Sequence, residues 1–231
     1  MMSQADFTLL FDLDGTLVDT DILHFGAYQT LLADHKRSIT MQIYKERIMG
    51  APNDAIMREL FPDLSLDSHR RLAERKEELF RAAIGKLEPT PGALALFEWA
   101  EARRVPIAVV TNAPRINAER MLAGLELLGR IDALVIGEEL PRGKPDPLPY
   151  LTGLQRLGGR AERALAFEDS LSGARAASAA GIHTFGIGTS LPAASLLDAG
   201  ADEVIADFTA AELWRRLDAL ELGAEAEESG A

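Results

Sequence analysis

The chain has 231 residues, of which 47% are hydrophobic, so it can fill the core of one large domain or of a domain with an insertion. It contains no cysteine, which excludes a disulfide framework and a cysteine nucleophile and fits a reducing compartment. The chain lacks both a run of about 18 apolar residues and the pattern of a secretory signal at its start. We therefore expect a soluble, cytoplasmic protein.

The net charge of −12 is unevenly distributed along the chain. Residues 20–89 contain 11 basic and 11 acidic side chains, whereas the remainder contains 13 and 25. Nucleic acids and anionic membranes require basic surfaces, so neither is an expected partner, and a monomer is the default expectation. Part of the acidic excess lies in residues 222–231, which the composition predicts to be a disordered tail.

The first predicted element is a buried strand over Phe7–Phe11, followed by a long helical segment. Apolar residues recur there at steps of three and four, as in Leu72, Leu79 and Phe80, and Ser65 is a predicted helix N-cap. These patterns predict an inserted all-helical cap over residues 20–89.

After residue 89 short apolar runs alternate with helical stretches. The strands are predicted at Pro106–Val110, Ala133–Ile136, Ala164–Phe167, Ile182–Ile187 and Val204–Ala206. The helices are predicted at Ala93–Arg103, Ile116–Leu128, Pro147–Leu157, Leu171–Ala180 and Ala210–Leu220. This alternation is typical of an α/β fold with a doubly wound parallel sheet, here formed by residues 1–19 and 90–231.

Two carboxylates, Asp12 and Asp14, directly follow the first strand. The carboxyl ends of parallel strands form the ligand crevice of such sheets, where one carboxylate could act as a nucleophile while the other moves a proton. An ordinary Asp-Gly turn is the alternative reading. An EF-hand loop is excluded because Leu23 stands where its twelfth ligand, a glutamate, would be.

Polar residues follow two further strands. Thr111 and Asn112 come directly before a predicted helix, an arrangement that binds anions but that also suits a simple helix cap. Lys144 lies in a loop stiffened by two prolines, where its charge could neutralise a phosphate or simply be solvated.

Glu168 and Asp169 end the strand before a helix of small residues. Adjacent acids at this place offer hard oxygens to Mg²⁺, whereas a helix cap would explain only one of them. If these acids meet Asp12 and Asp14 at one edge of the sheet, their repulsion requires protons or a divalent cation, and magnesium is the simplest answer.

With these residues the chain resembles the haloacid dehalogenase superfamily of aspartate-nucleophile phosphotransferases. FDLDGTLVDT is similar to the first family motif, VVTN to the second, the lysine of GKPDP to the third and FEDSLSG to the fourth, in the family's order. The helical insertion is similar to the C1 cap of the phosphoglycolate phosphatase and β-phosphoglucomutase group. The resemblance implies a Rossmann-like core with this cap.

The resemblance also implies roles for the motif residues. Asp12 would attack phosphorus, and Asp14 would protonate the leaving alcohol and then activate water. Thr111, Asn112 and Lys144 would hold phosphate oxygens. Magnesium would be bound by Asp12, Asp14, Asp169 and Glu168, with Asp14 contributing its backbone carbonyl.

The implied function is a magnesium-dependent phosphatase of a small phosphorylated metabolite. His24 and Thr20 match β-phosphoglucomutases, which makes a mutase the alternative, but Asn53 aligns with the arginine that grips a mutase's second phosphate. The three cap residues are candidate substrate contacts, and His24 is equally well explained as a histidine on a helix face. A non-catalytic protein that binds phosphorylated ligands is a third hypothesis.

Overall fold

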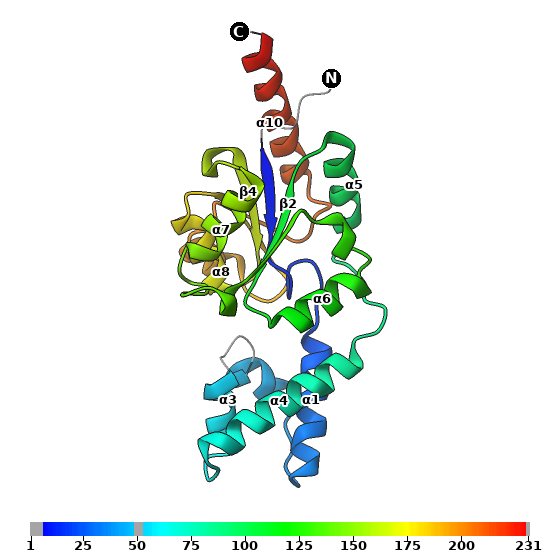
Figure 1. Cartoon of the computed structure of the whole chain (residues 1–231), viewed down its shortest axis with the longest axis vertical. Coiled ribbons are helices and arrows are strands. Elements are labelled where there is room, and N and C mark those ends of the chain that lie inside the picture. The colour runs from blue at the N-terminus through cyan, green and yellow to red at the C-terminus, as the bar shows by residue number, and fades with distance from the viewer. Residues whose placement is uncertain (1–6, 49–52, 230–231) are drawn as a thin grey trace. The chain divides into compact units, whose positions relative to one another are not determined.

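The computed structural model describes residues 7–48 and 53–229, and the side chains of all of these except 45, 46, 54 and 221–229. The chain divides into two compact units (Figure 1). Met1–Asp19 and Glu88–Ala231 form the α/β core, and Thr20–Leu87 forms a helical unit. The sequence placed the second boundary after residue 89. Pro89 belongs to the core because it pairs with Val18 in an antiparallel bridge.

The core is built on a six-stranded sheet in the order β3-β2-β1-β4-β5-β6, with every pair parallel. The strands are β1 Thr8–Phe11, β2 Ile107–Thr111, β3 Ala133–Ile136, β4 Ala164–Glu168, β5 His183–Ile187 and β6 Glu203–Ile205. This strand order is that of the doubly wound Rossmann fold. The predicted fold class is confirmed.

Helices cover both faces of this sheet (Figure 1). They are α5 Ala93–Arg103, α6 Arg115–Gly124, α7 Leu148–Leu157, α8 Leu171–Ala179, α9 Ala193–Asp198 and α10 Ala211–Ser229. Short helical turns occur at η2 Leu128–Arg130, η3 Gly137–Glu139 and η4 Ala161–Arg163. Because every strand pair is parallel, the carboxyl ends of all six strands lie at the same edge of the sheet.

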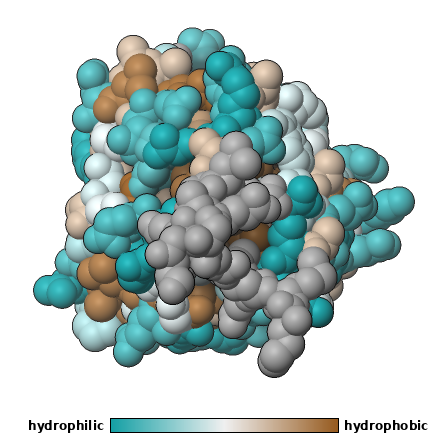
Figure 2. Space-filling view, turned by 90° about the horizontal axis from the view of Figure 1, so that it is seen from above, coloured by the Kyte–Doolittle hydropathy of each residue, from teal (hydrophilic) through white to brown (hydrophobic). Residues whose placement is uncertain are grey.

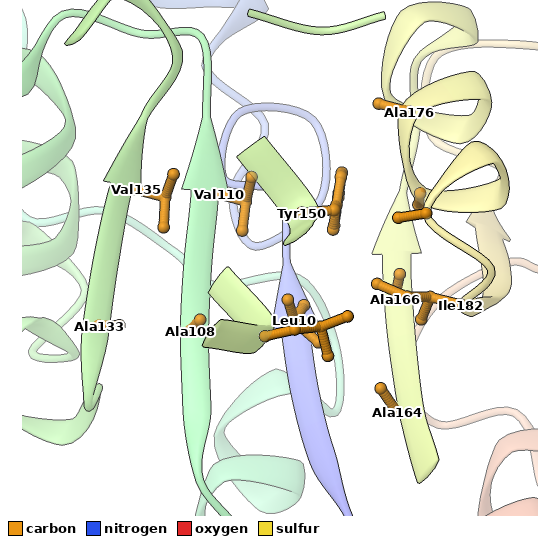
Figure 3. Packing of buried hydrophobic residues seen from close by; sticks show 13 residues of the cluster. Leu10, Ala108, Val110, Ala133, Val135, Tyr150, Ala164, Ala166, Ala176 and Ile182 are labelled. Atoms are coloured by element: carbon orange, nitrogen blue, oxygen red, sulfur yellow. The ribbon is translucent and has the colours of Figure 1, made fainter. Parts of the chain in front are cut away.

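One face of the sheet packs against α7 and α8 through a cluster of mostly small apolar residues (Figure 3). Leu10, Val110 and Val135 project from the strands, while Ala176 faces them from α8. The small alanines let the helices approach the sheet closely. Tyr150 of α7, fully buried, is the largest side chain in this cluster.

The opposite face contains a group of aromatic rings. Phe11 stacks on Phe167 at 4.7 Å between ring centroids and also contacts Phe97 of α5, at 5.2 Å. The ring centroids of Phe208 and Phe167 are 5.3 Å apart. Leu213 of α10 is completely buried. These buried rings fix the central strands that end in the acidic residues.

The helical unit has an apolar core of its own. Its helices are α1 Asp21–Asp34, α2 Met41–Ile43, α3 Asn53–Leu60 and α4 Leu66–Ala83, with a π-helical turn, η1 Tyr44–Ile48, after α2. Tyr28, Leu32, Met57 and Phe61 are among its buried residues. The Ser65 hydroxyl accepts the Ser68 backbone N–H, as expected of the N-cap of α4.

The structure differs from the prediction at three helices. The predicted disordered tail, residues 222–231, is helical as far as Ser229, because the alanines and glutamates of this stretch favour a helix that α10 has already begun. Residues 230–231 lie outside the described part. The helix predicted to reach Leu128 ends at Gly124, and α9 was not predicted because its six residues are too few for a periodic pattern.

None of the described helices is long and apolar enough to cross a lipid bilayer. On the face that Figure 2 shows, hydrophilic residues cover much of the coloured surface, and hydrophobic residues occur in patches between them.

Candidate functional site

The candidate site begins where β1 ends, between β2 and β4. The register pairs Phe11 with Phe167 of β4, so Asp12 lies level with Glu168 at the carboxyl edge of the sheet. The Asp12 backbone N–H donates to the Phe167 carbonyl at 2.9 Å, which extends the strand pairing by one residue. Asp12 is buried, while Asp14, two residues further on, is half-buried.

A tight turn places Asp14 and brings Asp169 close to it. Gly15 has φ +88°, and a Cβ at this residue would lie 2.0 Å from an Asp169 carboxylate oxygen. Glycine is therefore required both by the backbone conformation and by the space that Asp169 occupies. The Gly15 N–H donates to the Val18 carbonyl at 2.7 Å, and the Thr189 hydroxyl donates to the Gly15 carbonyl at 2.6 Å.

Lys144 joins the ends of β1 and β4. Its side chain is 3% exposed, and its Nζ donates to Asp12 Oδ1 at 2.6 Å and to Glu168 Oε1. The loop that contains the two prolines thus places the ammonium among the carboxylates, and the predicted role of Lys144 in phosphate binding stays a prediction. Such charge-assisted hydrogen bonds are shorter and stronger than those between neutral groups.

Burial and the neighbouring charges shift the pKa values of three groups in this cluster. Burial raises the pKa of Asp12 well above its ordinary value, with Lys144 opposing and Glu168 and Asp169 adding to the rise. Burial likewise raises the pKa of Asp169 to about 7, helped by the Glu168 charge. Burial disfavours charged Lys144, but its pKa is raised because the carboxylates of Asp12 and Glu168 outweigh that penalty.

The same cluster suits a divalent cation. Carboxylate oxygens of Asp12, Glu168 and Asp169 all lie within 4.8 Å of one another. They are hard oxygen donors whose mutual repulsion a cation relieves, and magnesium binds through such groups. The Thr16 hydroxyl orients Asp169 by donating to its Oδ1 at 3.3 Å.

The residues predicted to hold phosphate lie around Lys144. Thr111, at the end of β2, is buried, and its Oγ1 accepts the Ala113 backbone N–H at 3.0 Å. The Asn112 side chain is directed to the backbone of Lys144, accepting its N–H at 3.3 Å and donating to its carbonyl at 3.4 Å. The Asn112 amide therefore holds the lysine loop in place, a contact that sequence reasoning did not anticipate.

Two more residues of the cluster were missed as site residues. Tyr150 of α7 donates its hydroxyl to Glu168 Oε1 at 2.7 Å, and burial raises the pKa of this tyrosine well above its ordinary value. Ser190 hydrogen-bonds Asp169 from the loop after β5. Tyr150 is indistinguishable in sequence from a core aromatic, and Ser190 lies in a loop without a motif.

Within the helical unit the predicted residues His24 and Asn53 belong to a second polar cluster. Lys76 of α4, 4% exposed, has its Nζ 2.8 Å from His24 Nδ1 and 2.9 Å from Glu77 Oε1. Asn53 donates to Glu77 Oε1 at 3.2 Å. The burial of Lys76 and Glu77 could not be foreseen, because the apolar periodicity of this helix does not reveal which of its charged residues are buried.

His24 also stacks on Phe80, with the ring centroids 3.9 Å apart, and Thr20 is completely buried. These contacts all lie inside the helical unit. The role of His24, Asn53 and Thr20 toward a substrate remains a prediction.

The chain was compared with known proteins. It is 35% identical to a phosphorylated carbohydrates phosphatase of Thermotoga maritima over 84% of this chain and 91% of that protein. It is 32% identical to a validoxylamine A 7'-phosphate phosphatase of Streptomyces hygroscopicus subsp. limoneus over 87% of this chain and 93% of that protein.

A similar solved structure is that of CbbY from Rhodobacter sphaeroides in complex with phosphate. It has a TM-score of 0.76 at 27% identity and covers 87% of this chain and 94% of the other. The family model described as haloacid dehalogenase-like hydrolase matches residues 9–187, a span that includes β1, the helical unit and the sheet as far as β5. The chain belongs to the haloacid dehalogenase-like hydrolase family.

Proposed function

We propose that the protein is a magnesium-dependent phosphatase that hydrolyses a small phosphorylated metabolite through an aspartyl phosphate on Asp12. The observation that supports it most is the buried cluster in which Lys144 contacts Asp12 and Glu168 beside Asp169. The relatives named as a phosphorylated carbohydrates phosphatase and as a validoxylamine A 7'-phosphate phosphatase favour a substrate of this kind.

In the first step a carboxylate oxygen of Asp12 attacks phosphorus, and the bond to the ester oxygen breaks. Asp14, half-buried two residues away, donates a proton to the departing alcohol. In the second step water attacks the phosphorus of the aspartyl phosphate and gives its proton to Asp14. Inorganic phosphate leaves, and Asp12 and protonated Asp14 are regenerated.

The surrounding residues position and neutralise the transferred group. Lys144, Thr111 and Asn112 would bind phosphate oxygens, and the hydrogen bonds of the Asn112 amide to the Lys144 backbone support this role. Asp12, Asp169 and Glu168, with the carbonyl of Asp14, would hold magnesium. When bound, the ion neutralises charge on the carboxylates and on the phosphoryl group.

Replacing the nucleophile should abolish turnover without unfolding the protein. We expect Asp12→Asn to lower kcat on p-nitrophenyl phosphate by at least about a thousandfold, because an amide cannot form the phosphorylated intermediate. The matched control is Asp198→Asn, the same change at the exposed end of α9, which should keep wild-type kcat. Circular dichroism should show both variants folded, and substantial turnover by Asp12→Asn would contradict the mechanism.

Metal removal should silence the wild-type enzyme reversibly. Treatment with EDTA should lower turnover by more than about tenfold, and excess MgCl₂ should restore it. Because the pKa of Asp169 is about 7, protons compete with the cation below that pH. The magnesium concentration for half-maximal activity should therefore rise when the pH is lowered from about 7 to about 6. Turnover that persists in EDTA would disprove the metal dependence.

Product analysis separates the phosphatase from the mutase alternative, which rests on His24 and Thr20. Incubated with β-glucose 1-phosphate and a bisphosphate activator, a phosphatase releases inorganic phosphate, whereas a mutase forms glucose 6-phosphate. We expect inorganic phosphate, because Asn53 donates to Glu77 and supplies no positive charge for a second phosphate. Formation of glucose 6-phosphate would reverse this conclusion. A broad screen of phosphorylated metabolites with no turnover would instead favour the non-catalytic hypothesis.

A further inference from the structure

Tyr150 combines an apolar environment with a polar contact. It is fully buried in α7, and Figure 3 shows it among Leu10, Val110 and Val135 on one face of the sheet. A hydroxyl in such surroundings is costly unless it forms a hydrogen bond. Its partner is the carboxylate of Glu168, whose side chain is also completely buried.

The tyrosine touches both members of the Lys144–Glu168 ion pair. Its hydroxyl donates to Glu168 Oε1 at 2.7 Å, the same oxygen that accepts the Lys144 ammonium. Its ring centroid lies 5.2 Å from Lys144 Nζ, within the range of a cation–π contact. The hydroxyl and the ring therefore act on neighbouring groups and can be tested separately.

The Glu168 carboxylate is confined on its other sides as well. Oε2 accepts the Ser170 hydroxyl at 3.1 Å, and Ser170 also caps α8 through the Gly173 N–H. A Cβ on Gly173 would lie 1.9 Å from the carboxylate, so the first turn of α8 leaves just enough space for it. With these contacts Glu168 has a single position at the end of β4.

We propose that Tyr150 is a positioning residue for phosphate binding: by sharing Glu168 Oε1 with Lys144, its hydroxyl holds the ammonium between Glu168 and Asp12. A lysine ammonium has three N–H donors. Among the described residues two of them go to Asp12 and Glu168, which leaves one for a phosphate oxygen. The inference rests on the proposed function, because phosphate is the ligand that Lys144 would receive.

Removing the hydroxyl should disturb Lys144 in a defined direction. Without the Tyr150 hydroxyl, Lys144 would be the one donor to Glu168 Oε1 that remains among the described residues. Glu168 would then attract the Lys144 ammonium more strongly. The ammonium would move away from Asp12 and from the phosphate. The phenylalanine ring would still fill the cavity in the apolar cluster. The defect should therefore appear in phosphate binding, with little effect on the fold.

The test compares Tyr150→Phe with Tyr44→Phe. Tyr44 in the helical unit also donates its hydroxyl to a carboxylate, Asp21 Oδ1 at 3.0 Å, so the control removes the same kind of bond elsewhere. Calorimetry with inorganic phosphate in MgCl₂ gives Kd, and p-nitrophenyl phosphate gives kcat/KM. For Tyr150→Phe we expect Kd to rise and kcat/KM to fall by about tenfold each, with far-ultraviolet circular dichroism unchanged. Tyr44→Phe should match the wild type.

A double-mutant cycle shows whether Tyr150 acts through Glu168. In the background of Glu168→Gln, Tyr150→Phe should change the phosphate Kd by less than about twofold, since the shared oxygen has already lost its charge. The inference is wrong if Tyr150→Phe binds phosphate as tightly as the wild type, if its effect persists fully beside Glu168→Gln, or if it does not fold. A wild-type protein that neither binds phosphate nor turns over any phosphate ester would overturn the proposed function as well.

Discussion

The buried contact of Lys144 with Asp12 and Glu168 is the constraint on which the rest of the site depends. Oxygens of three carboxylates, those of Asp12, Glu168 and Asp169, lie within 4.8 Å of one another, and Lys144 is the one lysine of the described residues that pairs with them. Two like charges 4 Å apart repel by about 4 kcal/mol at an effective dielectric near 20. Burial, and after it the neighbouring carboxylates, raises the pKa values of Asp12 and Asp169, so the cluster favours protons or a cation on these oxygens. A divalent cation at these oxygens would offset this negative charge and would let a negatively charged phosphate ester approach.

The fold assembles this cluster from segments far apart in the sequence. Because β1 pairs with both β2 and β4, residues from positions 12, 111 and 168 end at one edge of the sheet. Phe11 and Phe167 stack beneath that edge and hold the two central strands in register. Gly15, without a side chain, lets the turn after Asp14 press against Asp169. The packing of the strands and the tight turn at Gly15 thus hold carboxylates close together that would move apart in water.

Much of this arrangement is predictable from sequence, because it follows from the periodicity of apolar residues and from the position of polar residues at strand ends. Apolar runs alternating with helices indicate a parallel sheet, and polar residues at strand ends such as Asp12, Thr111 and Glu168 then share one edge. What side chains touch is harder to predict. The phosphate-binding role of Asn112 stays a prediction, and its bond to the Lys144 backbone was not foreseen. Tyr150 looks like a core aromatic, but its hydroxyl donates to Glu168. Such contacts depend on helix placement, which periodicity does not specify. Similarly, the tail was predicted from charge, whereas helix propensity determines its conformation.

The most direct test of the account is to trap the phosphoryl group on the protein. Wild-type enzyme turning over a phosphorylated carbohydrate in MgCl₂ would be quenched in acid, digested and analysed by mass spectrometry, with and without hydroxylamine, which cleaves acyl phosphates. We expect one phosphoryl group, on Asp12, that hydroxylamine removes. A phosphoryl group on another residue, or active enzyme that never becomes phosphorylated under conditions in which hydrolysis of the intermediate is slow, would contradict it.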